Sequence, residues 1–175
     1  MSFEKSVLRD PFPLRLIDNI TQALNVAGSL LILALVVLVG VDVAGRNLFG
    51  APVSGVPELV TLSIVAIVFL QIPQALKDGR MTRTEVLNTL LKKRAPGLAK
   101  LVESFFDILG IGIVSIILWA TWPIFIKSWV RNDYIGAVGN FTAPTWPVKA
   151  AILIGGTMLI LQFGLLILRR HTRFS

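Results

Sequence analysis

Residues 42–58, DVAGRNLFGAPVSGVPE, place three charged side chains between two long apolar segments. No charged residue occurs in 19–41 or in 59–76. Helical periodicity between these segments is interrupted by five residues, namely Gly45, Gly50, Pro52, Gly55 and Pro57. The pattern predicts two membrane-spanning helices joined by a turn at the membrane surface.

The three charged residues Asp42, Arg46 and Glu58 are expected at the margin of the hydrocarbon core, where an ionisable group marks a candidate functional site. Asp42 and Arg46 have the i, i+4 spacing of a local ion pair. Glu58 is expected in the first turn of the next helix, where the helix dipole favours a carboxylate. Alternatively, Arg46 reaches Glu58 across the turn, or these residues face a partner subunit. A transported-ion site fits less well, because such sites usually lie near the midplane.

The composition indicates an integral membrane protein. The chain has 175 residues, of which 54% are hydrophobic and 15% are charged, whereas soluble domains have about 25% charged residues. This length is short for a complete transporter and indicates a subunit. The sequence has no cysteine, a single histidine (His171) and no phosphate-binding or nucleophile motif. We therefore expect no enzyme activity, no cofactor and no metal site.

The apolar segments predict an all-α membrane protein of one domain with four transmembrane helices. The expected spans are about 23–44, 56–76, 104–126 and 146–168. Residues 1–22 form the expected cytoplasmic amphipathic lead-in. The basic segment 77–103 is expected to be cytoplasmic and to contain a short in-plane amphipathic helix. Its residues predicted to contact anionic phospholipids are Lys92, Lys93 and Arg94.

Two further segments flank the third span. Glu103 and Asp107 precede it at i, i+4 spacing. An acid–base pair is one interpretation, but a water-exposed helix end compensated by nearby basic residues fits better. Residues 127–147 are expected to form a loop.

The charge distribution predicts that both termini are cytoplasmic. Thirteen of the 17 Lys and Arg residues fall in the segments expected inside, and this asymmetry follows the positive-inside rule. The net charge of +7 is thus assigned to membrane topology and lipid contacts, and nucleic-acid binding is not expected. All four tryptophans fall near the opposite interface, where they are expected to form one aromatic belt and not a stacking site: Trp119, Trp122, Trp129 and Trp146.

Three local signatures resemble the DctQ-like family, the small membrane subunit of tripartite ATP-independent periplasmic (TRAP) transporters. The first is the turn from Arg46 to Glu58 followed by Leu59. The second is the segment 79–87. The third comprises Thr142, Pro144, Trp146 and Pro147, with Gly155 and Gly156 behind them.

The resemblance implies a non-catalytic subunit of the bacterial inner membrane. Its implied partners are a large multi-span subunit that carries the substrate and sodium sites, and a periplasmic protein that delivers an organic acid. Helix faces with Gly110, Gly112, Gly155 or Gly156 are expected to be packing surfaces. The alternative function is a homodimeric proton-coupled exporter that uses Glu58.

The absence of native cysteine allows a direct test of the predicted topology. Single cysteines introduced at Ser54 and Asn140 should react with a membrane-impermeant maleimide added outside, and a cysteine at Thr89 should not. Labelling in the reverse pattern would refute the orientation derived from the positive charges.

Overall fold

The computed structural model describes residues 12–79, 96–137, 139 and 141–172. These residues form four helices and one β-hairpin. In chain order the elements are α2 (Phe12–Phe49), α3 (Val56–Lys77), α5 (Pro96–Arg131), β1 (Tyr134–Ala137), β2 (Phe141–Pro144) and α6 (Trp146–Thr172). All four helices are long and apolar enough to cross a membrane. The prediction of four membrane-spanning helices is therefore confirmed.

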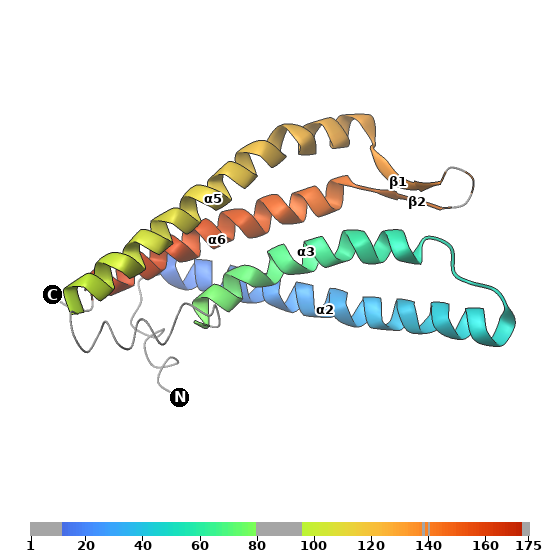
Figure 1. Ribbon diagram of the computed structural model, residues 1–175, viewed down its shortest axis with the longest axis horizontal. Coiled ribbons are helices and arrows are strands. Elements are labelled where there is room, and N and C mark those ends of the chain that lie inside the picture. The colour runs from blue at the N-terminus through green and yellow to red at the C-terminus, as the bar shows by residue number, and fades with distance from the viewer. Residues whose placement is uncertain (1–11, 80–95, 138, 140, 173–175) are drawn as a thin grey trace.

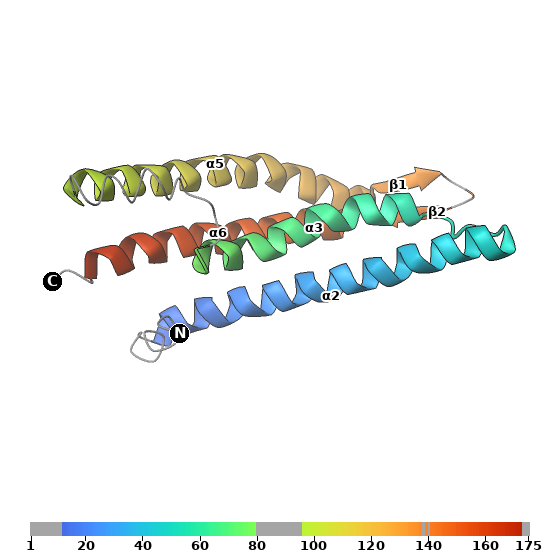
Figure 2. The ribbon, with the colours of Figure 1, turned by 60° about the horizontal axis from the view of Figure 1, so that its bottom comes forward.

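The helices lie side by side in the order α5, α6, α3, α2, and both views show this row (Figures 1 and 2). The central pair α3 and α6 pack against each other, while α5 packs on α6 and α2 packs on α3. Within the described residues, α2 touches α6 over a much smaller contact, and no comparable contact joins α2 to α5. The chain is thus an open row and not a closed four-helix bundle.

Residues with a positive φ lie at helix ends where the sequence predicts turns. Gly50 follows α2 with φ 63°, and Gly55 precedes α3 with φ 85°. Pro57 then occupies the first turn of α3, where its missing N–H leaves no helical hydrogen bond unmade. Asn132, with φ 50°, ends α5; asparagine adopts this conformation more readily than most residues.

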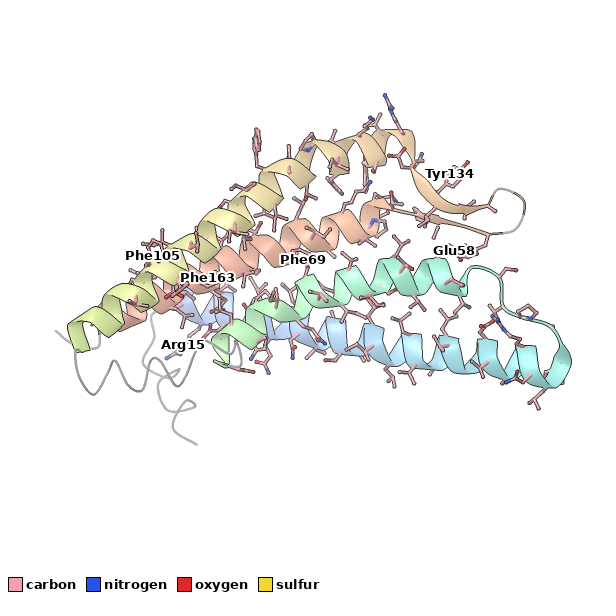
Figure 3. All side chains as sticks on the ribbon, in the orientation of Figure 1. Arg15, Glu58, Phe69, Phe105, Tyr134 and Phe163 are labelled. Atoms are coloured by element: carbon pink, nitrogen blue, oxygen red, sulfur yellow. The ribbon has the colours of Figure 1, made fainter. Side chains whose placement is uncertain are left out.

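Close contacts at glycines hold the row together. A Cβ atom on Gly155 would lie 2.0 Å from the carbonyl oxygen of Phe69, so α6 meets the backbone of α3 at this point (Figure 3). A Cβ on the adjacent Gly156 would lie 2.7 Å from Leu118 of α5. Gly155 therefore allows α6 to pack closely on α3, and Gly156 allows it to pack closely on α5.

Other glycines repeat this arrangement in the adjoining contacts. Gly110 of α5 accommodates the ring of Phe163, and Gly28 of α2 accommodates Gln71 of α3. Of the glycines expected to provide packing surfaces, three thus pack within the chain; only Gly112 has no atom within 4 Å of its Cβ position. Small residues in this protein mainly set the spacing of its own helices.

The structure differs from the expected elements in two places, and a third expectation lies outside the described residues. Residues expected as a loop, 127–147, instead continue α5 to Arg131 and then form the antiparallel pair of β1 and β2, in which Ile135 faces Ala143. The part of the expected lead-in after residue 11 is continuous with α2. The predicted in-plane helix, with Lys92, Lys93 and Arg94, falls within residues 80–95, outside the described residues.

A side chain at Gly155 should disrupt the central contact. Gly155→Ala places a methyl group against the Phe69 backbone, and overpacking of this kind costs about 1–3 kcal/mol, more than the gain of about 1 kcal/mol in helix propensity. Thermal unfolding in detergent should show a lower midpoint for this variant. Gly112→Ala is the matched control and should unfold at or above the wild-type temperature; equal midpoints for Gly155→Ala and wild type would contradict the assignment.

Candidate functional site

The predicted charged turn forms a compact polar structure after α2. The carboxylate of Asp42 is buried, and its Oδ2 lies 2.9 Å from Nη2 of Arg46. Its Oδ1 accepts a hydrogen bond of 2.9 Å from the backbone N–H of Val53, and the N–H of Ala51 donates to the carbonyl of Gly45 at 3.1 Å. Asp42 therefore ties the segment after α2 back onto the helix, satisfying a backbone donor in the turn.

The structure distinguishes between the two ion-pair partners that the sequence offered for Arg46. Arg46 pairs with Asp42 one helical turn away, and its side chain remains 60% exposed. Glu58 lies in the first turn of α3 (Figure 3) and forms no ion pair within the described residues. The contact of Arg46 with Glu58 across the turn, one of the alternatives from the sequence, is not the arrangement in this structure. A role of these residues at a subunit interface stays a prediction.

A second polar network braces the β-hairpin between α5 and α6. Ser128 is fully buried and donates to Oδ2 of Asp133 at 3.0 Å, while Lys149 donates to Ser128. Thr145 donates to the carbonyl of Asp133 through both its hydroxyl, at 3.1 Å, and its N–H, at 2.9 Å. A lysine beside a serine can activate a nucleophile, but this hydroxyl is inaccessible and is held by Asp133. The network is structural.

The hairpin also contacts the turn before α3. A Cβ at Gly55 would lie 2.0 Å from the ring of Phe141, so the phenyl group packs directly over the glycine backbone. Because Gly55 is the residue preceding α3, this contact connects the α5–α6 hairpin to the α2–α3 turn. We call this part of the molecule, residues 46–58 and 131–146, the hairpin end.

Two of the four tryptophans contact each other. Trp129 of α5 and Trp146 of α6 meet edge to face, with ring centroids 4.6 Å apart. Trp119 precedes Trp129 by ten residues, which corresponds to about 15 Å along a helix, and it is 81% exposed. The placement of Trp119, Trp122, Trp129 and Trp146 at a lipid interface stays a prediction.

A third polar cluster, at the opposite end of the row, was not predicted. Asp18 and Thr21 of α2 are buried, and both accept hydrogen bonds from Nε2 of Gln162 in α6, at 3.2 and 2.9 Å. Nζ of Lys77, at the end of α3, lies 3.4 Å from Oδ2 of Asp18. This cluster, which we call the polar junction, joins three helices where α2 reaches α6.

The burial of two carboxylates corrects two expectations from the sequence. Asp18 was assigned to an amphipathic lead-in at the membrane interface, but it faces the protein interior. Asp107, expected at the water-exposed end of the third span, is also fully buried. The sequence contained one indication of the polar junction. Gln162 is the only hydrogen-bonding side chain in residues 158–168, and an isolated polar group at membrane depth needs a partner.

None of these clusters provides catalytic or metal-binding chemistry. Within the part of the chain that the structure describes, no three His, Asp or Glu side chains are grouped to hold a metal ion. The charged groups of these clusters lie toward the ends of the helices, where Asp18, Asp42 and Asp133 bind neighbouring side chains or backbone groups. The arrangement anchors helices to one another.

Removing both charges of the polar junction should destabilise the protein by less than the sum of the two single removals. Asp18→Ala leaves the Lys77 ammonium and the Gln162 amide without their carboxylate, and a hydrogen bond to a charged group contributes about 1.5–3 kcal/mol. In a double-mutant cycle with Lys77→Met, unfolding midpoints should reveal a coupling of at least about 0.5 kcal/mol. Additive effects would show that the pair carries no net interaction.

Comparison with known families identifies the chain. Residues 35–173 match the family model described as tripartite ATP-independent periplasmic transporters, DctQ component. No curated protein and no solved structure matches the chain. The matched region covers most of the sequence and includes the last part of α2 and all of α3, α5, the hairpin and α6. The chain therefore belongs to the DctQ family, and it is a small, multi-pass inner-membrane component of a TRAP transporter.

Proposed function

We propose that this subunit is a non-catalytic scaffold that packs on a large membrane subunit, which in turn carries the substrate and sodium sites. Membership of a transporter-component family supports this role over that of an enzyme. All four helices lack charged residues across their central segments, so the chain offers no ion pair or carboxylate at the depth where transporters usually bind their cargo.

The open row is the observation that carries the proposal. Both outer helices expose large apolar side chains, including Leu33 and Val36 of α2 and Ile116 and Trp119 of α5, each more than 60% exposed. A row of four helices presents two broad apolar faces, whereas a closed bundle would bury much of this surface. Such a shape suits a subunit that enlarges the membrane-embedded surface of a partner.

The hairpin end suits contact with a soluble protein. The hairpin is fixed at its base by Asp133 and Thr145 and at its side by Phe141 on Gly55. We propose that this braced element faces the periplasm and meets the binding protein that delivers an organic acid. A rigid element loses little conformational entropy on binding, which favours its use as a docking surface.

The exporter alternative is less consistent with the structure. Glu58 lies in the first turn of α3, directly after the turn-forming Gly55 and Pro57, and not at the midplane. A proton-coupled carboxylate is expected deep in the membrane with a neighbouring substrate cavity. Robust proton-coupled efflux by the purified chain alone would overturn the scaffold proposal.

The scaffold proposal predicts that the full chain co-purifies from native membranes with a much larger membrane protein. Arg46→Ala and Glu58→Ala should lower the recovered complex, because they alter the charged turn, without changing which substrate is taken up. Thr61→Ala, an exposed position on the same helix whose hydroxyl bonds only its own backbone, is the matched control. Recovery of the wild-type chain only as a free homo-oligomer would contradict the proposal.

A further inference from the structure

An apolar groove of about 910 Å³ lies between α2 and α3. Residues 32–48 of α2 and 60–68 of α3 line it, and all of its side chains are aliphatic except Asn47. Gly40 forms part of its wall, with no atom of the chain within 4 Å of its Cβ position. The groove is therefore open to whatever surrounds the helices in the membrane.

The groove is confined mainly to one half of the membrane. Helix α3 has 22 residues, about 33 Å, and so matches a hydrocarbon core of about 30 Å. The groove begins about 6 Å and ends about 18 Å from the start of α3. It thus occupies the leaflet at the hairpin end.

Helix α2 closes onto α3 just beyond the groove. A Cβ on Gly28 would lie 2.7 Å from Gln71, and the Gln71 amide donates to Ser29 at 3.3 Å. A partner's transmembrane helix would have to continue past this point into the other leaflet. An acyl chain ends near the midplane, so the closed groove favours a lipid over a helix.

Charged groups stand where the headgroup of such a lipid would lie. Arg46 follows Val39 and Val43 of the groove by seven and three residues, and it therefore projects from the same face of α2. One of its nitrogens is used by Asp42, but the side chain remains 60% exposed, and a guanidinium has five N–H donors suited to phosphate oxygens.

The rim of the groove carries the ion pair of Asp42 and Arg46, whose formal charges cancel. Glu58 does not belong to this rim, because it precedes Val60 of the groove by two residues and so projects from a different face of α3. The rim therefore offers Arg46 as a phosphate ligand without selecting among phospholipid headgroups.

We propose that the groove binds one phospholipid of the leaflet at the hairpin end. Its acyl chains lie between α2 and α3, and its phosphate is bound by Arg46. This inference does not depend on the scaffold role.

The test is native mass spectrometry of the full chain released from nanodiscs that contain equal amounts of phosphatidylethanolamine and phosphatidylglycerol. The wild type should retain one phospholipid. Gly40→Leu, which fills the groove, and Arg46→Gln, which removes the phosphate partner, should each lower retention roughly tenfold. Gly112→Leu fills open space outside the groove and should retain lipid like the wild type.

Two results would overturn the proposal. One is wild-type lipid retention by Gly40→Leu or by Arg46→Gln. The other is loss of the large subunit from Gly40→Leu with lipid retention unchanged, which would assign the groove to a protein helix. If Gly40→Leu fails to fold, as judged by thermal unfolding, Val36→Phe blocks the same groove from an exposed position and replaces it.

Discussion

The close approach of α6 to the backbone of α3 at Gly155 is the constraint on which the rest of the row depends. At this point the absence of a side chain lets the two central helices touch, and the next residue, Gly156, does the same toward α5. Lipid tails are as apolar as leucine, so association of helices in a membrane relies on such packing and not on a hydrophobic driving force. The two adjacent glycines make α6 the shared neighbour of α3 and α5.

Helix α2 packs on α3, and polar groups near its two ends attach it further to the core. Asp18 and Thr21 bind Gln162 and Lys77 at one end, and Asp42 binds the turn before α3 at the other. Between these attachments α2 and α3 separate to form the apolar groove. Polar contacts thus fix the position of the outermost helix, while the space they leave open remains available to membrane components.

The sequence predicted the features that depend on local pattern. Uncharged segments of sufficient length predicted four helices, and the spacing of Asp42 and Arg46 predicted an ion pair that the structure contains. The polar junction could not be predicted in the same way, because Asp18 and Gln162 are 144 residues apart and only the packing order of the helices brings them together. The burial of Asp107 is missed for the same reason.

The hairpin was missed for a different reason. Each strand has only four residues, β1 contains Gly136 and β2 ends at Pro144, and a segment rich in Gly and Pro is ordinarily a loop. Tertiary contacts hold it, since Phe141 covers Gly55 and the Ser128 network fixes its base. The open row likewise follows from which glycine faces which helix, and single-sequence periodicity does not contain that information.

The order of the helices is the central claim, and the distance between α2 and α5 tests it most directly. Spin labels at Leu30 and Ile116, both exposed and at similar depth, can be introduced as cysteines into a chain that has none, and their separation can be measured by double electron–electron resonance. The row places two helices between the labels, so a single distance well beyond the roughly 8–10 Å between neighbouring helix axes is expected. A dominant short distance, as in a closed bundle with α2 against α5, would contradict the row.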